Sequence, residues 1–518
     1  MPLIVQSGSV DDASLILPDL YVQIQTPTPT SLQGVSTSRV GIVGTGSWGP
    51  VGAPVTLGGI ADSTLAFGTM STRDDDIGTA VAVMAMIGAS DFRAVRMTDG
   101  TDAAATTTAS GLKFTALYTG STGNGISVSL AQDTINTARW ILTIALSGRN
   151  TETYPVLLSG ADYTTFWATL QKLVNTGISG TAAKSALVQL STVPAVAPTA
   201  FIRQTLSGGT DGNSGVTAAT LLGIDGTATR TGLYALRGTQ CALGFIAGDD
   251  ETVWADVAAF GQSEAVYMML CGAQSSGYAS LATTISGLGI NIADVKVLTG
   301  DWLYWYDSVN GVMRLLSPKA FAAGILAVTS AASSGLNKQI VAGILGSEQY
   351  GLVSTGQATP YSRAELTAMA QNGIDVITNP APGGAYWALR IGHNASLNTA
   401  IWGDNYTRMT NFIARTLAAG MGIYVGSTIT ADLMANASAT VKGTLAVMVQ
   451  TGMLGADPLT GAVPYSVICN ATNNTDTSIA AGFMIMDVRV KYLGINEKFI
   501  VNLEGGVGVT VSSSGLAS

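Results

Sequence analysis

Residues 20–57, LYVQIQTPTPTSLQGVSTSRVGIVGTGSWGPVGAPVTL, contain the pattern that decides the fold. The segment begins with a short strand pattern in which alternate side chains are apolar. Pro27 and Pro29 follow, and they impose an extended spacer because proline cannot donate to a strand ladder. A buried strand is expected next, over residues 38–46. The first strand is therefore set apart and must pair elsewhere. Its apolar face consists of Leu20, Val22 and Ile24.

The residues after this segment predict a small α/β unit that ends near Thr98. Residues 76–89 are apolar enough for a helix packed on both sides, and the strand FRAVRM follows at 92–97. From about Asp99 to Leu206 the sequence becomes rich in Thr, Ser and Gly, and its alternating stretches fit short antiparallel strands. We expect an inserted, mostly β domain there.

The middle of the chain predicts a layered α/β domain. Helical patterns at 251–261 and 320–330 alternate with short apolar strands. One helix is clearly delimited, because Ser362 is a suitable N-cap, Glu365 stands at the capping-box position and Asn372 ends the pattern.

The last part predicts two long helices, around 406–421 and 431–453, followed by the strand patterns VICN, FMIMDVRVKYL, KFIVNL and VGVTVSS. The last two patterns alternate clearly. The C-terminus, like the N-terminus, therefore offers strands that need a partner sheet. Their apolar faces consist of Phe499, Val501 and Leu503, and of Val507, Val509 and Val511.

Composition indicates a protein that buries much of its surface against other protein. Charged residues make up 11% of the 518, against about 25% in typical soluble domains, while 47% are hydrophobic. Such a chain inserts in a membrane or becomes buried in an assembly. The apolar runs at 77–90 and 321–333 are shorter than the roughly 18 to 20 residues that cross a bilayer. Burial in an assembly is the remaining class.

The N-terminal sequence indicates where the protein is located in the cell, and its charge indicates which partners it can bind. The start, MPLIVQSGSVDDAS, has no basic region and no long apolar stretch, so we expect no signal peptide and a chain that stays in the cytoplasm. The net charge is −9 and no cluster of Lys and Arg is present. Nucleic-acid phosphates require a concentrated basic face, so we expect no nucleic acid partner.

Two glycine-rich motifs have a ligand-binding and a turn interpretation. Gly44 to Gly49 spell G-x-G-x-x-G after a strand pattern, but a dinucleotide site requires a helix directly afterwards, and Pro50 and Pro54 prevent one. Residues 208–212, GGTDG, lack the Lys and the capped helix of a phosphate loop. We interpret both as turns and expect no cofactor.

The acidic runs at 74–76 and 249–251 both precede helical patterns, where carboxylates favour the positive end of the helix dipole. Calcium binding is the alternative, although neither run has the ligand spacing of an EF-hand loop. His393 is the only histidine, and no G-x-S-x-G elbow is present, so we expect neither a catalytic triad nor a metal site. The three cysteines are expected to be small buried side chains: Cys241, Cys271 and Cys469.

Several separated segments resemble the contractile tail sheath family, which includes phage, pyocin and type VI secretion sheaths, and they occur in the family's order. Residues 20–57 resemble the sheath opening, residues 206–212 the turn into its central domain, and residues 465–504 its closing sheet. Where many sheaths have a Gly-Ala-Arg-Thr run, this chain has ALRIGHNAS, which indicates a divergent subfamily. Further matching segments are 65–68, 84–97, 118–130 and 362–377.

The resemblance implies a multidomain chain of α/β and β units with extended terminal arms. An α+β inner domain would be built from N- and C-terminal parts, and the central layered α/β domain would have a subtilisin-like fold without catalysis. The implied division is an N-terminal arm (1–30), the first part of the inner domain (31–98), an inserted β-rich domain (99–206), the central domain (207–390), the C-terminal conserved sheath domain (391–505) and a C-terminal arm (506–518).

The resemblance also implies a structural subunit, not an enzyme, that polymerises around a tail tube and contracts to drive the tube through the host cell envelope. Its partners would be copies of itself, the tail tube protein, and baseplate and tail terminator proteins, without insertion in a membrane. It would be assembled in the host cytoplasm and act in the virion tail. The alternatives are another self-assembling tail or surface-layer protein, or a subtilisin-like hydrolase.

The family's terminal arms leave their own subunit and add strands to neighbouring sheets, which identifies candidate residues here. The candidate interlocking residues are Leu20, Val22, Ile24, Phe499, Val501, Leu503, Val507 and Val509. The family's inner domain faces the tube partly through charges on helices. Arg408, Arg415 and Lys442 are the basic residues available for this contact, and the alternative is that each is a solvated helix residue.

Overall fold

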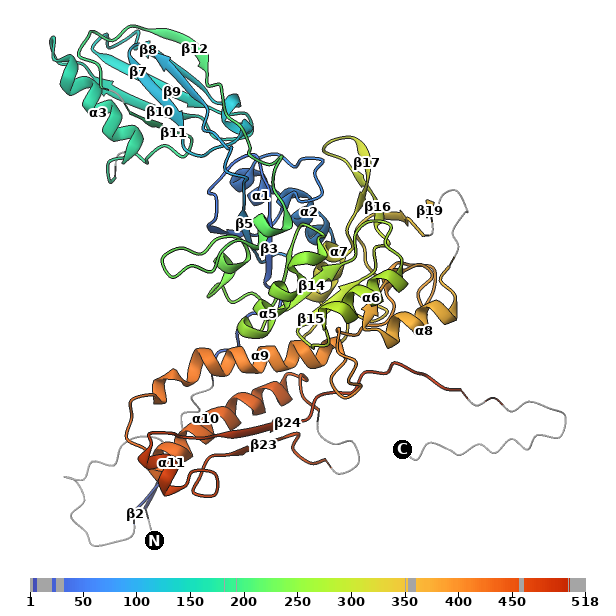
Figure 1. Ribbon diagram of the computed structural model, residues 1–518. Coiled ribbons are helices and arrows are strands. Elements are labelled where there is room, and N and C mark those ends of the chain that lie inside the picture. The colour runs from blue at the N-terminus through green and yellow to red at the C-terminus, as the bar shows by residue number, and fades with distance from the viewer. Residues whose placement is uncertain are drawn as a thin grey trace.

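A seven-stranded sheet with helices on both faces forms the centre of the molecule (Figure 1). The computed structural model describes residues 3–6, 21–24, 32–180, 182–191, 193–349, 351–352, 360–455, 461–501 and 503. The strands of the central sheet are β3 (Val40–Gly44), β4 (Pro54–Leu57), β5 (Phe92–Arg96), β13 (Leu243–Ile246), β14 (Tyr267–Cys271), β15 (Val295–Leu298) and β20 (Ile374–Asp375). Their order is β20-β15-β14-β13-β3-β5-β4, and only β4, at one edge, runs antiparallel to its neighbour.

Strand β3 shows why both faces of this sheet are covered. One face carries α1 (Ile60–Phe67), α2 (Ile77–Ile87) and α7 (Lys319–Val328), and the other carries α4 (Ala218–Leu222), α5 (Trp254–Glu264), α6 (Tyr278–Leu288) and α8 (Arg363–Gln371). All five residues of β3 are buried, and successive side chains point to opposite faces. Ile42 packs in the core of the first face and Val43 in the core of the second. A continuous apolar strand of this kind is typical of a parallel sheet between two helical layers.

The pairing of β3 corrects the expected place of residues 31–98. They were expected to form an inner domain with the C-terminal part, but β3 pairs with β13 of the central part from Val40↔Leu243 onward. The reason is that a strand buried on both faces fits only inside a covered sheet, and the sequence does not show which sheet that is. The residues before β3 do contact the C-terminal part, since the N–H of Leu32 donates to Thr444 Oγ1 at 3.2 Å. The other domain limits stay a prediction.

Between β5 and β13 the chain forms a separate β-rich unit, at the upper left of Figure 1. Its elements are β6 (Thr106–Ala109), β7 (Leu112–Ala116), β8 (Ser127–Gln132), β9 (Arg139–Ala145), β10 (Glu152–Leu157), α3 (Tyr163–Asn175), β11 (Val188–Leu190) and β12 (Phe201–Thr205). They form two antiparallel sheets, ordered β10-β9-β8-β12 and β11-β7-β6. Trp140 and Phe166 meet edge to face in their core, with centroids 6.5 Å apart.

Arg96, the last residue of β5, joins this unit to the central sheet. Its buried guanidinium donates to the carbonyls of Gly49 (2.9 Å), Thr119 (2.8 Å) and Asp211 (3.1 Å). Burial lowers the pKa of Arg96 below its ordinary value. The segment 208–212 is a turn with glycines at positive φ at both ends, as its sequence predicts.

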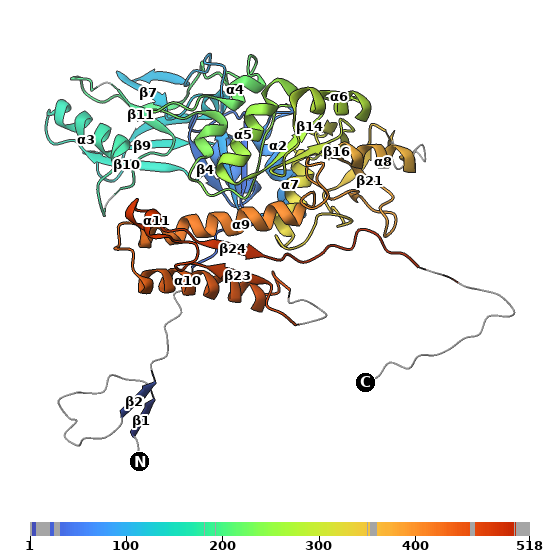
Figure 2. The same cartoon turned by 60° about the horizontal axis from the view of Figure 1, so that its bottom comes forward.

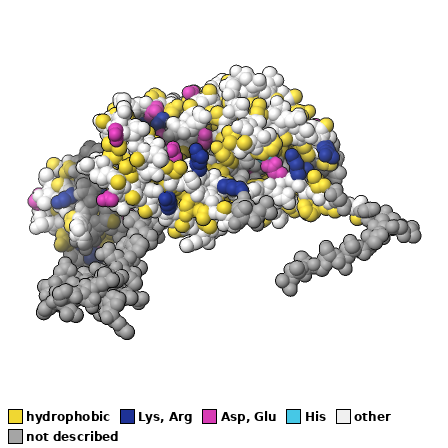
Figure 3. Space-filling model, turned by 90° about the horizontal axis from the view of Figure 1, so that it is seen from below, with side chains coloured by type: hydrophobic (Ala, Val, Ile, Leu, Met, Phe, Trp, Pro, Cys, Tyr) yellow, Lys and Arg dark blue, Asp and Glu magenta, His cyan; other side chains and the backbone are white. Residues whose placement is uncertain are grey.

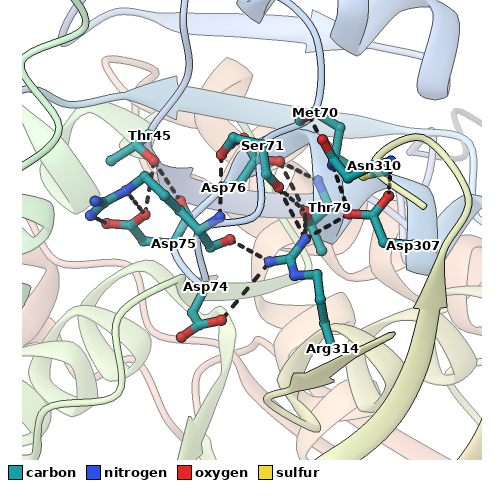
Figure 4. A network of polar contacts seen from close by, with 11 residues as sticks. Thr45, Met70, Ser71, Asp74, Asp75, Asp76, Thr79, Asp307, Asn310 and Arg314 are labelled. Atoms are coloured by element: carbon teal, nitrogen blue, oxygen red, sulfur yellow. Dashed lines mark hydrogen bonds and ion pairs between the residues drawn. The ribbon is translucent and has the colours of Figure 1, made fainter. Parts of the chain in front are cut away.

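The acidic run at 74–76 precedes α2, as expected. Asp76 is the N-cap, and its carboxylate accepts a hydrogen bond from the Thr79 N–H at 2.7 Å. Figure 4 shows that Arg314 reaches the same residues and bonds Thr79 Oγ1 (2.9 Å) and Asp307 Oδ2 (3.1 Å). These contacts hold a small sheet, ordered β17-β16-β18-β19, against α2. Its strands are β16 (Leu303–Asp307), β17 (Val312–Leu316), β18 (Ile344–Ser347) and β19 (Gly351–Leu352).

Other local predictions agree with the structure. Ser362 and Glu365 form both bonds of a capping box at the start of α8. The glycine pattern that begins at Gly44 is followed by strand β4, and the next helix begins only at Ile60. Asp250 caps a short helix at Glu251–Val253. The three cysteines are buried and free: Cys241, Cys271 and Cys469.

The C-terminal unit lies below the central sheet in Figure 1. It consists of α9 (Asp404–Gly420), α10 (Ala431–Gln450), β23 (Tyr465–Ile468), α11 (Asp476–Ala480) and β24 (Asp487–Val490), and a small bridge of β21 (Ile377–Thr378) and β22 (Ala388–Leu389) lies before it in the chain. Met409, Phe412, Val441 and Leu445 form the core between the two long helices. Within the described residues, no helix combines the length and apolar content that crossing a membrane requires.

Candidate assembly surfaces

The C-terminal unit has a sheet that is incomplete in the single chain. β23 and β24 pair antiparallel, with Tyr465 opposite Val490 and Ile468 opposite Asp487. One face packs toward α10, where Val467 is buried. Among the described residues this sheet has no third strand, so the outer edge of each strand lacks a ladder partner. Such an edge can accept a strand from another chain.

An apolar groove of about 890 Å³ opens beside this sheet. It lies between the end of α9, the start of α10 and β24, and its lining is largely apolar. Two large apolar side chains stand exposed on its rim, Val425 and Phe483. The interior lining includes Leu417, Met421, Val441, Met486 and Val488. An apolar groove with exposed apolar side chains on its rim is a candidate site for association.

The chain beyond β24 is extended and exposes consecutive apolar side chains. Residues 491–501 and 503 have no regular secondary structure and run away from the C-terminal unit (Figure 2). Phe499 is 82% exposed and Leu503 is 92% exposed, with Ile500 and Val501 exposed between them. The strand expected over KFIVNL is therefore absent from the single chain, because a strand requires a ladder and none of the described strands lies beside it. Val507 and Val509 lie outside the described residues.

The N-terminal arm does contain a strand, and its partner lies in the same chain. β2 (Tyr21–Ile24) pairs in parallel with β1 (Leu3–Gln6). This pair belongs to none of the other sheets and lies apart from the rest of the molecule (Figure 2). Val22 and Ile24 fall in β2, and Leu20 lies outside the described residues. A pair of short strands is marginally stable by itself, so further strands are needed to complete it.

His393 holds the start of the C-terminal stretch. Its ring stacks on Trp402 with centroids 4.1 Å apart, and Nε2 lies 3.2 Å from Glu497 Oε1. The imidazole is buried, and its Nδ1 has no hydrogen-bond partner. The only histidine therefore contacts Glu497, and neither of its nitrogens bonds a serine hydroxyl within the described residues.

The three basic residues expected at a tube surface lie in different environments. Arg408 is buried, and its guanidinium donates to the carbonyls of Thr329 (2.8 Å) and Ser330 (3.0 Å), so it cannot face a partner. Arg408 is therefore neither a tube-facing nor a solvated helix residue, which corrects the expectation. The sequence could not show this, because helix periodicity does not indicate which face other elements cover. Burial lowers the pKa of Arg408 to about 10, which keeps it charged near neutral pH.

Arg415 is half-buried and bonds the carbonyls of Gln240 (3.1 Å), Cys241 and Ser36, so most of its donors serve the chain itself. Burial lowers the pKa of Arg415 to about 10. Lys442 on α10 is exposed, and a tube contact through it stays a prediction.

A buried ionic cluster connects the C-terminal unit to the central sheet. Lys296 Nζ of β15 lies 2.7 Å from Asp375 Oδ2 and 3.0 Å from Asp404 Oδ1, the latter in the first turn of α9. The hydroxyl of Tyr267 donates to the same Asp404 carboxylate. Burial lowers the pKa of Lys296, but the two carboxylates outweigh this effect and leave that pKa raised. The cluster fixes the start of α9 on the central sheet.

Comparisons with known proteins identify this architecture. No protein-family model and no curated protein matches the sequence. A sheath tail protein of Listeria innocua matches with a TM-score of 0.60 at 14% identity, over 85% of this chain and 90% of that one. A sheath tail protein of Desulfitobacterium hafniense matches with a TM-score of 0.55 at 14% identity, over 87% and 93%. The helical sheath of the anti-feeding prophage, in its contracted state, matches with 0.53 at 11% identity, over 95% and 99%.

This chain has the tail sheath fold. The resemblance expected from the sequence is thus confirmed at the level of the fold, including a mixed α/β architecture with several sheets.

Sequence reasoning missed two features of the candidate surfaces. The acceptor edges of β23 and β24 were not foreseen, because an edge is a property of pairing and not of the strand pattern. The contact of His393 with Glu497 joins residues 104 positions apart, and no spacing rule signals it. The apolar positions Phe499, Val501 and Leu503 are exposed, as is Ile500 between them, and their place at an interface stays a prediction.

Proposed function

We propose that the chain is a structural subunit of a contractile tail sheath, which polymerises around a tail tube and contracts to drive the tube through a cell envelope. The observation that carries the proposal is that the open sheet β23–β24 and the exposed apolar arm occur in the same chain. The tail sheath fold, found over nearly the whole chain, supports it. The role is non-enzymatic.

In this mechanism the arms of one subunit add strands to the open sheet of another. Main-chain hydrogen bonds would connect the subunits, and the alternate side chains Phe499, Val501 and Leu503 would fill the apolar groove and fix the register. Donor and acceptor surfaces differ, so the contact is heterologous and builds rings or helices instead of closed dimers. The arms would keep neighbours connected while the bodies change position during contraction.

The remaining partners follow from the same proposal. The sheath would enclose a tail tube protein, with Lys442 as one contact, and would join baseplate and tail terminator proteins at its ends. It would be assembled in the host cytoplasm and act in the tail of a virion.

Negative-stain electron microscopy of the purified chain tests the proposal. We expect hollow cylinders wide enough to enclose a tube. Narrow tubes or flat lattices would instead support another tail or surface-layer protein. A chain that stays monomeric at high concentration would refute the proposal.

A further inference from the structure

A second hollow lies at the start of the C-terminal stretch, and basic side chains gather in it. This basic cleft, of about 1300 Å³, lies between α8, the loop after α7 and residues 495–499. Within the described residues none of its Lys or Arg side chains forms an ion pair. Its one carboxylate, Glu497, contacts His393. The four cationic residues of the cleft are Lys338, Arg363, Arg390 and Lys498.

These four residues are a sixth of the 24 Lys and Arg of a chain whose net charge is −9, and they line one hollow. Charged side chains are sparse on the face seen from below, where they lie among uncharged and apolar ones (Figure 3). Among the deeply buried cations, Lys296, Arg314 and Lys319 pair with carboxylates. Arg96 and Arg408 are satisfied by backbone carbonyls instead. Four like charges around one hollow repel one another until a carboxylate-bearing partner neutralises them. The cleft therefore fits an acidic segment.

The N-terminal arm supplies such a segment. Residues 1–38 contain three aspartates, Asp11, Asp12 and Asp19, and no Lys or Arg. Strands β1 and β2 of this arm lie across the molecule from residues 495–499 in both views (Figures 1 and 2). The arm of a second copy is therefore the fitting donor. Resting on the proposed function, we propose that the basic cleft binds the acidic segment at Asp11 and Asp12 of a second copy.

The lengths of chain permit this contact together with strand addition. Val490, the end of β24, and Ile495, the start of the cleft wall, are five residues apart and thus within roughly 18 Å. Asp12 and Tyr21, the start of β2, are nine residues apart and span up to roughly 32 Å. A copy whose β2 pairs with β23 or β24 can therefore place its aspartates in the cleft.

A charge-swap experiment on the full chain tests the contact. We expect Lys338→Glu with Arg363→Glu to raise the subunit concentration needed for polymers, measured by sedimentation, by about tenfold or more. Asp11→Lys with Asp12→Lys should do the same. Combining all four changes restores opposite charges and should recover most of the loss. Lys172→Glu with Lys184→Glu, two exposed sites on the β-rich unit, is the control with the same net charge and should polymerise like the wild type.

The outcomes separate this contact from the proposed function. If the wild type polymerises and the cleft variants polymerise equally well, the proposed contact is wrong and the sheath proposal still stands. The same conclusion follows if the variant with all four substitutions does not recover polymer formation. A wild type that never polymerises would refute both. Binding of a fluorescent oligonucleotide to the wild-type subunit, lost in the cleft variant, would assign the cleft to nucleic acid and also overturn the contact. The melting temperature of each unassembled variant checks that it folds.

Discussion

The central sheet and the C-terminal sheet use similar strands but are completed differently. The central sheet has seven strands, helices on both faces and buried ion pairs such as Lys296 with Asp375. The C-terminal sheet has two strands in the described part of the chain, one covered face and an apolar groove beside it. The first provides the stability of the subunit. Under the proposed function, the second gains further stabilisation when a strand of another subunit pairs with it.

The free energy gained by burying apolar side chains supports this difference between the two regions. Fully burying one large apolar side chain contributes about 1.5–3 kcal/mol. Phe499, Val501 and Leu503 are mostly exposed in the single chain, so together they offer several kcal/mol that only a partner can supply. In a monomer, an exposed apolar arm of this composition favours aggregation. In a polymer, the same apolar side chains would stabilise the contact between subunits.

The largest expected effect comes from removing the N-terminal arm. Deleting residues 1–26 should abolish polymer formation while the subunit stays folded, because β1 and β2 contribute to no sheet of the body. Electron microscopy would follow the polymers, and thermal melting would follow the fold.

Replacing residues 1–26 by a Gly/Ser segment of the same length is the matched control for chain length. It should fail to polymerise as well, because a flexible segment offers no strand pattern. Cylinders formed by the deleted chain would show that the arm is dispensable and would remove the contrast between the two regions.

A substitution in the central region should instead lower the stability of the single subunit. Lys296→Met leaves Asp375 and Asp404 buried without their cation, which costs about 3–5 kcal/mol of unfolding free energy. Denaturant unfolding of the unassembled subunit would measure this loss. Lys442→Met removes an exposed lysine and should change stability by less than about 0.5 kcal/mol. A loss below about 1 kcal/mol for Lys296→Met would show that the cluster is not needed for stability.

Local signals made the capped helix α8 and the strand β2 predictable, whereas the pairing of β2 with β1 of the same chain was not predicted. The capping residues Ser362 and Glu365 act through neighbours in sequence, so their consequence can be predicted directly. The proline spacer expected after β2 lies outside the described residues. The apolar run of β3 likewise predicted a buried strand. Its sheet could not be predicted, because the choice of β13 as neighbour depends on residues about 200 positions away.

The candidate site was predictable only in part for the same reason. Alternation selected Phe499, Val501 and Leu503, which are exposed in the structure together with Ile500, and their role in assembly stays a prediction. Arg408 was placed wrongly, because its helix α9 is covered by the loop after α7 and the carbonyls of that loop take its guanidinium. The basic cleft joins four cations from four separate parts of the chain, so the sequence shows no cluster of them.

The smallest expected effect is on the pH dependence of the unfolding free energy, and it differs between a buried helix N-cap and an exposed one. Burial raises the pKa of Asp76, the N-cap of α2, from 3.8 to about 6. Between about pH 4 and pH 6 the folded state therefore holds a proton that the unfolded state has released. The free energy of unfolding falls as pH rises through this window, by about 3 kcal/mol at most. Asp76→Asn keeps an acceptor for the Thr79 N–H but removes the titration, so its stability relative to the wild type should rise between pH 4 and pH 7.

Asp162, the N-cap of α3, is exposed and provides the matched comparison. Its hydrogen bonds with Thr165 lower its pKa, so the stabilisation that it provides is present above the unfolded pKa and is lost as pH falls. Asp162→Asn should therefore lose stability relative to the wild type as pH rises, the reverse of Asp76→Asn. Denaturant unfolding at pH 2, 3, 4, 5, 6 and 7 measures both trends, because Asp76 titrates between about pH 4 and pH 6 and Asp162 at and below its ordinary pKa of 3.8. Equal signs for the two variants would mean that burial does not decide how these caps titrate, and that the covered and exposed regions do not differ in this respect.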